Sequence, residues 1–288
     1  MKHEVLTDSV SMPNEGIDRV SVRRVQIMRV DEEGTSTKMD TVACEEPLEI
    51  LLSYRIKQKK QTHNLTVTMR TPGEDEALVK GFLYAEGLID GVSVIEGIEL
   101  DENQVIVELN ERVDLDHKKF ERNFVSSSSC GLCGKASLEA LSLGNCKPVK
   151  SDLRITQNVI EQLDAKMRAS QGVFSVTGGL HACALFSEDG DLVSIKEDIG
   201  RHNALDKLIG EQLSRQDLPL ADSILLLSGR VGYEMAQKAV RAGVPVVVAI
   251  GAPTSLAVEI LESFGVTLIG FLRNGKYNVY THPERVIP

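Results

Sequence analysis

The chain has 288 residues and no tryptophan, so it is long enough for one large domain or two modest ones whose core rests on Val, Ile, Leu and Ala. Its net charge of −10 argues against general binding to nucleic acid or to anionic membranes, because phosphate contacts need clustered Lys and Arg. The first residues, MKHEVLTDSV, lack the apolar core of a signal peptide, and no apolar run is long enough to span a bilayer. We therefore expect a cytoplasmic protein without membrane insertion, with reduced thiols rather than a disulfide framework.

Residues 1–125 predict a β-rich N-terminal domain of the α+β class. Its expected strands are rich in β-branched residues and partly alternate between apolar and polar: SVRRVQIMRV, DTVACEEPLEILLSYRI, HNLTVTMRT, GIEL and QVIVEL. One helix interrupts them. Its start matches a capping box formed by Thr71 and Glu74, with Pro72 in the favoured first helical position. Gly87 is the expected terminator of this helix.

Residues 151–288 predict an α/β domain. A helix is expected from Thr156, followed by a hairpin that turns at Asp189–Gly190 and a further helix from about Arg201. The buried strands SILLL and VPVVVAI then alternate with the helices YEMAQKAVRAG and TSLAVEILESFG, and VTLIGFLRN turns through Asn274–Gly275 into KYNVYT. This alternation predicts a parallel or mixed sheet with helices on its faces.

Residues 126–150, between the two domains, are assigned to a loop and linker that contains the segment SSSSCGLCGK. A structural zinc site normally needs four protein ligands, and only Cys146 and His117 flank the cysteine pair at poor spacing, so no zinc is expected. A thioredoxin-like dithiol would need a strand–motif–helix context and an aromatic neighbour that the sequence lacks. Glycines beside both Cys130 and Cys133 indicate accessible thiols on a bendable loop, which leaves sulfur relay and electron relay open.

Three loops that follow expected strands carry cationic residues and hydrogen-bond donors. Ligands of open α/β sheets gather outside the carboxyl ends of the strands, where helix N-termini point donors outward. Each loop alone could be a plain turn, whereas the three together suit phosphate groups and a purine. The residues are Ser228, Gly229 and Arg230 after the first strand, Gly251, Thr254 and Ser255 after the second, and Arg273, Gly275 and Lys276 after the third.

The segment EDIGRHNALDK is the other dense polar cluster, at the expected start of a helix. His202 and Asp206 lie one turn apart, so the carboxylate could orient the imidazole. The alternative is a solvated helix start that Asn203 or Asp198 caps. For His181, which follows two glycines at an expected strand start, a ligand-facing position and a satisfied core position are both open.

The segments CGLCG, TGGLHA, EDIGRHNALDK, LLSGR and GFLRNGKYNVY, in this order, resemble those of the FdhD-type formate dehydrogenase accessory proteins, the FdhD/NarQ family. The resemblance runs from about Val20 to the end of the chain. It implies a sulfurtransferase that accepts persulfide sulfur from a cysteine desulfurase. The sulfur passes to the molybdenum cofactor, molybdenum bis(molybdopterin guanine dinucleotide), before formate dehydrogenase takes that cofactor. The resemblance also implies a cytidine-deaminase-like sheet in the C-terminal domain and a homodimer.

The resemblance assigns roles to residues as well. Cys130 would carry the persulfide and Cys133 would be its partner. The cofactor-binding segment of the family corresponds to Phe271, Leu272, Arg273, Asn274, Gly275 and Lys276. The loops and the helix start described above add further candidate cofactor contacts: Ser228, Gly229, Arg230, Arg201 and His202.

Two alternatives accompany the sulfurtransferase. An escort chaperone would bind the cofactor without sulfur chemistry, and Cys130→Ala would then leave its function intact. A zinc-dependent deaminase, which the implied fold suggests, needs an H-x-E or C-x-E element and a P-C-x-x-C element. Here HAC lacks the glutamate and Cys130 follows Ser129, so we reject the deaminase. The thiol that finally delivers sulfur and the dehydrogenase that is served stay open.

Overall fold

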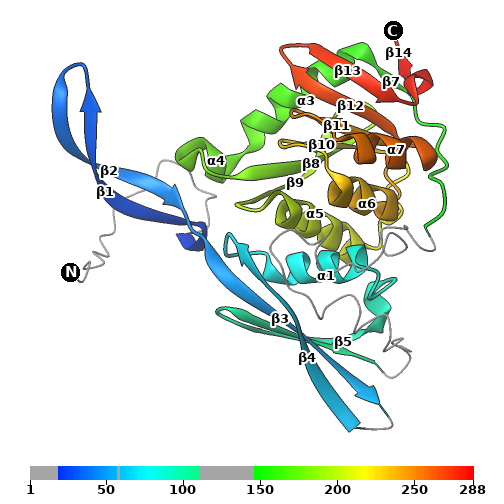
Figure 1. Cartoon of the computed structure of the whole chain (residues 1–288), viewed down its shortest axis with the longest axis horizontal. Helices are drawn as coiled ribbons and strands as arrows, with labels where there is room; N and C mark the ends of the chain where they lie inside the picture. Colours follow the sequence, from blue (N-terminus) through cyan, green and yellow to red (C-terminus); the bar gives the residue numbers. More distant parts are fainter. Residues whose placement is uncertain (1–18, 57–58, 111–145) are drawn as a thin grey trace.

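The computed structural model describes residues 19–56, 59–110 and 146–288, and Figure 1 shows their arrangement. The N-terminal part is built mostly of strands, and the C-terminal part is a mixed sheet with helices on its faces, so the predicted fold class is confirmed. Most of the predicted loop and linker falls outside the described residues, and the domain boundaries therefore stay a prediction.

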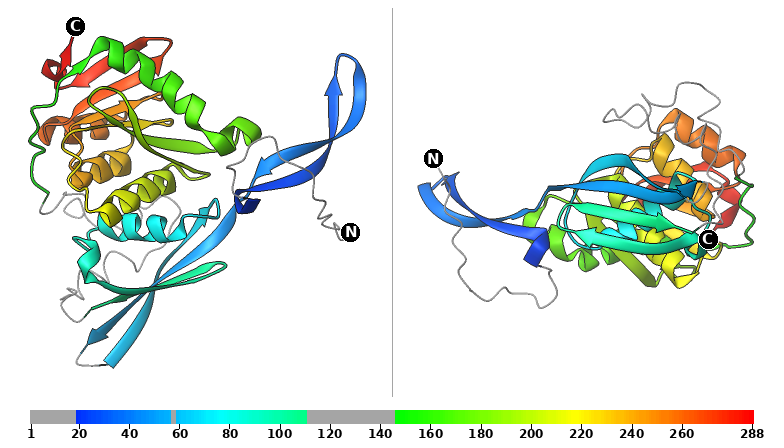
Figure 2. Two further views of the ribbon diagram at one scale, coloured as in Figure 1. Left: turned by 180° about the vertical axis from the view of Figure 1, so that it is seen from behind. Right: turned by 90° about the horizontal axis from the view of Figure 1, so that it is seen from below.

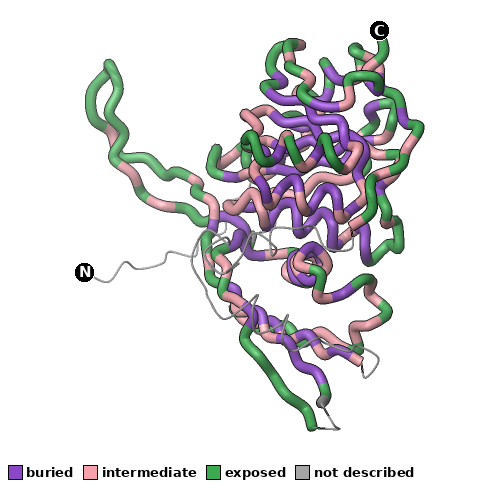
Figure 3. Tube along the Cα trace, turned by 45° about the vertical axis from the view of Figure 1, so that its right-hand side comes forward, coloured by how far each residue is buried: buried purple, intermediate pink, exposed green. Residues whose placement is uncertain are grey.

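A two-stranded arm extends from the body of the molecule (Figures 1 and 2). Its strands β1 (Val22–Asp31) and β2 (Gly34–Ala43) pair antiparallel along their whole length, after the short 3-10 helix η1 (Arg19–Ser21). Most of its side chains are exposed, as the green tube of Figure 3 shows. The segment DTVACEEPLEILLSYRI is divided near Cys44, and its two halves belong to different sheets.

The remaining N-terminal strands form a four-stranded sheet covered on one face by a single helix. Its elements are β3 (Glu46–Ile56), β4 (Lys59–Arg70), α1 (Asp75–Ala85), η2 (Val92–Val94), β5 (Ile95–Asp101) and β6 (Gln104–Leu109). The strand order is β4–β3–β6–β5, in which β3 and β6 are parallel and the other neighbours are antiparallel. Leu78, Val79 and Leu83 of α1 are buried against the apolar side chains of this sheet.

The capping box predicted at the start of α1 is wrong. The helix begins at Asp75, and Glu74 adopts a left-handed backbone (φ 58°) and makes no side-chain capping bond. Thr71 lies outside the helix because it serves the contact with the C-terminal part: its hydroxyl accepts a hydrogen bond from Ile199 N (3.2 Å). At the other end, Gly87 follows the helix as predicted, with a φ of 76° that suits glycine.

The C-terminal part is built on a six-stranded mixed sheet. Its strands are β8 (His181–Ser187), β9 (Leu192–Asp198), β10 (Ser223–Leu227), β11 (Val246–Ala249), β12 (Thr267–Arg273) and β13 (Lys276–Thr281). Their order is β13–β12–β11–β10–β8–β9. Strands β10, β11 and β12 run parallel to one another, and the other neighbours pair antiparallel. The hairpin predicted at Asp189–Gly190 joins β8 to β9.

Helices cover both faces of this sheet. They are α3 (Gln157–Ser170), α4 (Gly172–Thr177), α5 (Arg201–Arg215), α6 (Tyr233–Ala242) and α7 (Ser255–Ser263). Helix α3 packs on one face, and α5, α6 and α7 pack on the other. Thr156 caps α3 at the predicted start, since its hydroxyl accepts a hydrogen bond from Val159 N (3.3 Å). No helix in the described part of the chain has the length and apolar character needed to cross a membrane.

The two parts of the molecule meet where α1 packs on α5. A Cβ atom at Gly81 would lie 1.9 Å from the carbonyl oxygen of Asp206, and one at Gly210 would lie 1.9 Å from the carbonyl oxygen of Ala77. Both distances are far below van der Waals contact, so only glycine fits at either position. The two helix backbones therefore touch, and α1 is held between the four-stranded sheet and α5.

A buried polar network lies beside this contact. The Lys207 ammonium is 2.8 Å from Asp198 Oδ2 and donates a hydrogen bond to the carbonyl oxygen of Thr71 (2.9 Å). Asp198 also accepts hydrogen bonds from Gly200 N (2.8 Å) and from the Asn203 amide (3.1 Å). Buried charges are stable only when they are paired and hydrogen-bonded, so these groups fix the start of α5 against the N-terminal part. The alternative prediction of a solvent-exposed helix start is wrong, because the side chains of Asp198, Asn203 and Lys207 are buried.

The C-terminal residues return to the body of the domain after β13. His282 has a left-handed backbone (φ 47°); its Nδ1 lies 3.0 Å from Glu284 Oε1 and its Nε2 lies 2.9 Å from the carbonyl oxygen of Glu262. Burial alone would lower the pKa of His282, but the two acceptors outweigh burial and raise it. The segment that follows comprises η4 (Pro283–Arg285) and β14 (Val286–Ile287), which pairs with β7 (Ile155–Thr156).

Replacing Gly210 with alanine should destabilise the whole protein, because the new Cβ would push α5 away from α1. We expect the free energy of unfolding, measured in urea, to fall by about 3 kcal/mol. Gly91→Ala is the matched control: a Cβ there meets no atom within 4 Å, and we expect a change below about 0.5 kcal/mol. A Gly210→Ala protein as stable as the wild type would contradict the backbone contact.

The raised pKa of His282 predicts a stability that depends on pH. The stabilising effect of its protonation is fully present below the unfolded-state pKa of about 6.5, and it is lost as pH rises through the higher folded-state value. We therefore expect the Tm of the wild type to fall between about pH 6 and pH 8 more steeply than that of His282→Asn, a variant that tolerates the left-handed backbone. Parallel Tm curves for the two proteins would rule out this role of His282.

Candidate functional site

The loops at one edge of the six-stranded sheet come together in space. Because β10, β11 and β12 are parallel, their carboxyl ends share this edge, where β8 also begins and β9 ends. Beyond the strands the backbones stay in contact: Gly251 N donates a hydrogen bond to Gly229 O (3.3 Å), and Phe271 N donates one to Gly251 O (3.2 Å). The structure thus gathers the three loops that the sequence singled out.

Glycine is required where the first two of these loops touch. A Cβ at Gly251 would lie 2.8 Å from the carbonyl oxygen of Gly229 and 2.9 Å from the nitrogen of Arg230. The side chain of Arg230 is exposed next to this close approach. Thr254 caps α7, since its Oγ1 accepts a hydrogen bond from Ala257 N (3.3 Å).

The turn between β12 and β13 carries the segment 271–276. Phe271 is exposed and has a left-handed φ of 58°, and the strand register shifts between Gly270 and Arg273. Such a backbone is uncommon for a bulky residue, and strained conformations concentrate at functional sites. Leu272 is fully buried in the core, so only its backbone could meet a ligand. Asn274 and Gly275 form the turn with positive φ, and the exposed residues of the segment are Phe271, Arg273, Asn274 and Lys276.

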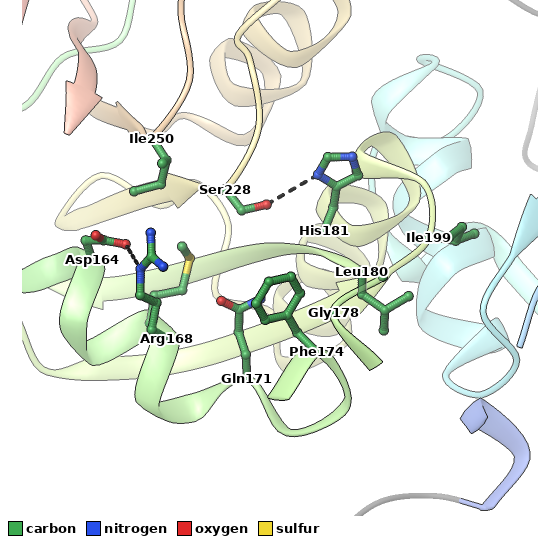
Figure 4. A pocket seen from close by; sticks show the side chains of 12 residues that line it. Asp164, Arg168, Gln171, Phe174, Gly178, Leu180, His181, Ile199, Ser228 and Ile250 are labelled. Atoms are coloured by element: carbon green, nitrogen blue, oxygen red, sulfur yellow. Dashed lines mark hydrogen bonds and ion pairs between the residues drawn. The ribbon is translucent and has the colours of Figure 1, made fainter. Parts of the chain in front are cut away.

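A cavity of about 520 Å³ opens at this edge, on the side of the sheet that α3 covers (Figure 4). Its walls come from α3, α4, the start of β8 and the segments that follow β9, β10 and β11. They combine apolar side chains with a few polar groups, which is usual for small-molecule sites. The lining includes Asp164, Gln171, Phe174, His181, Ser228 and Ile250.

His181 lines this cavity rather than the protein core. It is half-buried, and its Nδ1 lies 3.4 Å from Ser228 Oγ, which also accepts a hydrogen bond from Ala182 N (2.9 Å). Burial lowers the pKa of His181, and the nearby charges of Arg201 and His202 lower it further. The imidazole is therefore neutral at neutral pH, able to both donate and accept a hydrogen bond.

His202 pairs with a different carboxylate from the one predicted. Its Nε2 lies 2.8 Å from Glu234 Oε2 on α6, and both side chains are partly exposed. Asp206 is buried and is instead bound to Lys238, whose Nζ lies 2.5 Å from Asp206 Oδ1. The expected orientation of His202 by Asp206 is wrong, because α5 turns Asp206 toward Lys238. Glu234, which the sequence analysis missed, takes that role.

Arg201 completes the group at the start of α5. A Cβ at Gly229 would lie 3.5 Å from His181 Nδ1 and 3.7 Å from Arg201 Cδ, so the loop after β10 passes directly beside both side chains. The edge therefore places a permanent positive charge close to the neutral imidazole at the cavity wall. Such a pair suits a ligand that has both an anionic group and an uncharged polar group.

Cys130 and Cys133 lie in the segment 111–145, outside the described residues, so their roles remain predictions. Within the described ranges, no group of three or more His, Cys, Asp or Glu side chains could hold a metal ion. Gln171 and Phe174, which also line the cavity, were not predicted from the sequence. No periodic pattern marks the six-residue helix α4; the only local signal is the Gln–Gly step that interrupts the run after α3.

Comparison with known proteins shows the family to which the chain is similar. The model of the FdhD/NarQ family matches residues 43–287. A curated relative from Sulfolobus acidocaldarius, named sulfur carrier protein FdhD, is 45% identical over 270 residues, which cover 93% of this chain and 99% of its own. A relative of the same name from Streptomyces coelicolor is 45% identical over 280 residues, covering 93% and 96%.

A solved structure supports the fold independently. The crystal structure of a protein from Desulfotalea psychrophila, provisionally described as a formate dehydrogenase accessory protein, superposes with a TM-score of 0.71 at 22% identity. The match covers 92% of this chain and 99% of the other. Since the family model matches residues 43–287, which is most of the sequence, this chain belongs to the FdhD/NarQ family.

Proposed function

We propose that this chain is a sulfurtransferase that carries persulfide sulfur from a cysteine desulfurase to the molybdenum cofactor. The cofactor, molybdenum bis(molybdopterin guanine dinucleotide), is the substrate, and formate dehydrogenase is the enzyme that receives it. Cys130 carries the sulfur and Cys133 is its partner. The cofactor docks at the carboxyl edge of the six-stranded sheet.

The observation that carries this proposal is a cationic edge with an adjoining cavity on an acidic protein. Arg201, Arg230 and Arg273 all lie at this edge, although the net charge of the chain is −10. A guanine dinucleotide brings phosphate groups, which guanidinium and backbone N–H groups bind well. The curated relatives, at 41–45% identity, are named sulfur carriers, which supports the sulfur chemistry.

Loading of sulfur is a thiol exchange. The thiolate of Cys130 attacks the terminal sulfur of the persulfide on the desulfurase. A new S–S bond forms on Cys130, the S–S bond of the desulfurase persulfide breaks, and the desulfurase cysteine leaves as a thiolate. The exchange needs no oxidant or reductant, because one persulfide replaces another.

Delivery of sulfur uses the second cysteine. The thiolate of Cys133 attacks the inner sulfur of the Cys130 persulfide, a Cys130–Cys133 disulfide forms, and hydrosulfide leaves toward the cofactor. The transferred sulfur gains two electrons, which the two cysteine thiols supply. A cellular dithiol reductant of the thioredoxin class then restores both thiols.

Different residues at the edge bind different parts of the cofactor. Arg230 and Arg273 are exposed, and their guanidinium groups bind phosphate. His181 and Ser228 offer uncharged hydrogen-bonding groups at the cavity wall. Glu234 holds His202 in place, so that the imidazole keeps one orientation at the start of α5.

We further propose that the carrier works in the cytoplasm as a homodimer. The family resemblance supports the dimer and both partners, the desulfurase and the dehydrogenase. The cysteine pair lies between the two parts in the sequence, and we expect it to meet the desulfurase and the cofactor in succession.

Mass spectrometry of the intact protein tests the carrier chemistry. After incubation with a cysteine desulfurase and cysteine, we expect the wild type and Cys133→Ala to gain one sulfur atom, and Cys130→Ala to gain none. Cys44→Ala is the matched control, because Cys44 is buried and its thiol pKa is raised by burial, which suppresses the nucleophilic thiolate. Wild-type protein that gains no sulfur from an active desulfurase would favour the escort chaperone.

The phosphate role of the edge predicts weaker nucleotide binding after loss of its charges. We expect the double variant Arg230→Ala/Arg273→Ala to bind GDP about tenfold more weakly than the wild type in calorimetry, with a smaller dependence on salt. Arg24→Ala, an exposed arginine on the arm, is the matched control and should bind GDP as the wild type does. Unchanged GDP affinity and salt dependence in the double variant would exclude these two arginines from phosphate binding.

A further inference from the structure

Gln171 stands out among the polar residues of the cavity. It occupies the break between α3 and α4, where it is the C-cap residue of α3 and the N-cap residue of α4, with φ −79° and ψ 95°. Its side chain makes no capping bond to α4. Only 5% of the residue is exposed, and its amide points into the cavity (Figure 4).

The backbone of Gln171 is satisfied, whereas its side chain is not. Its N–H donates a hydrogen bond to Arg168 O (3.4 Å), and its carbonyl oxygen accepts one from Ser175 N (3.3 Å). No described residue forms a hydrogen bond with the side-chain amide. The residue is largely buried, but its side chain lines the cavity, where a ligand can complete the hydrogen bonds of the amide.

An aromatic ring lies beside this amide. Phe174 lines the cavity three residues further on, and Figure 4 shows its ring next to Gln171. Its backbone is fixed from the neighbouring strand, because the Glu197 carboxylate accepts hydrogen bonds from Val173 N (2.9 Å) and Phe174 N (2.8 Å). Met167, Leu180, Ile199 and Ile250 add apolar surface to the same cavity.

The charges around the cavity favour an uncharged ring inside it. Asp164 and Arg168 line the wall as a pair, with Arg168 Nε 2.8 Å from Asp164 Oδ1, so their charges offset each other. The exposed side chains of Arg230 and Arg273 lie outside the cavity, after the end of β10 and at the end of β12. A ligand with a planar polar ring and phosphate groups therefore fits with its ring in the cavity and its phosphates at the edge.

We propose that Gln171 determines specificity by hydrogen-bonding the amide-like edge of an amino-oxo-pyrimidine ring, while Phe174 stacks on its face. The side-chain amide presents one donor and one acceptor side by side, which matches the adjacent N–H and carbonyl groups of that ring. Guanine and pterin share this ring. The inference rests on the proposed function, because the molybdenum cofactor carries both.

Calorimetry with GDP and with neopterin as separate probes tests this assignment on the full chain. We expect Gln171→Met, which keeps the length of the side chain but removes its hydrogen bonds, to weaken binding of at least one probe about tenfold. Gln162→Met is the matched control, since Gln162 is exposed on α3 and does not line the cavity. A loss confined to GDP assigns the cavity to guanine, and a loss confined to neopterin assigns it to pterin.

Thermal unfolding without ligand distinguishes a structural role of Gln171 from the proposed role in ligand binding. Because the side-chain amide makes no hydrogen bond to a described residue, its removal should leave the Tm of Gln171→Met equal to or above that of the wild type, whereas loss of a structural contact would lower it. Equal affinity of the wild type and Gln171→Met for both probes, or an affinity loss accompanied by a lower Tm, would overturn the inference.

Sulfur loading on Cys130 distinguishes this inference from the proposed function. If neither probe binds the wild type while Cys130 is loaded, the ring assignment is wrong and the carrier chemistry stands. If Cys130 is not loaded either, the proposed function is wrong as well.

Discussion

The contact of α1 with α5 through Gly81 and Gly210 fixes the N-terminal sheet against the C-terminal domain. Helix α5 begins at the edge of the six-stranded sheet where the candidate site lies, so anything that holds α5 also holds that edge. The buried network of Lys207, Asp198 and Thr71 locks the same helix at its start. The candidate site residues of the C-terminal domain are thus positioned partly by the N-terminal part.

Charge is distributed at the site in a way that suits a nucleotide-like substrate. The exposed guanidinium groups lie on loops beyond the strands, where water screens their repulsion. The adjoining cavity is lined by a neutral imidazole, a hydroxyl, an amide and apolar side chains. A ligand with separate anionic and heterocyclic portions can satisfy both regions at once, whereas a simple anion would leave the cavity polar groups unpaired.

Local signals predicted the elements of the C-terminal domain well. Thr156 begins its helix with a cap, the Asp189–Gly190 turn joins two strands, and the alternating strands and helices form the expected mixed sheet. These elements are specified by capping, turn chemistry and hydrophobic periodicity, all of which are readable over a few residues. The gathering of three loops at one edge followed from the parallel strands.

Contacts between distant segments explain what the sequence did not reveal. Thr71 does not cap α1, because its hydroxyl accepts a hydrogen bond from Ile199 N. Asp206 does not pair with His202, because it is bound to Lys238 on another helix. No local sequence pattern marks Gln171, because its position at the cavity depends on where the break between α3 and α4 lies in the assembled fold. Pairings of this kind depend on the assembled fold and cannot be deduced from spacing along one helix.

The proposed function requires that sulfur on Cys130 reaches a cofactor held at the cationic edge. The most direct measurement is to load Cys130 with a heavy sulfur isotope, add molybdenum bis(molybdopterin guanine dinucleotide), and determine by mass spectrometry where the label goes. We expect the label to leave the protein and appear in the cofactor, and we expect Arg230→Ala/Arg273→Ala to slow this transfer without preventing loading. A label that stays on Cys130, or that escapes as sulfide at the same rate with or without cofactor, would rule out transfer to the cofactor.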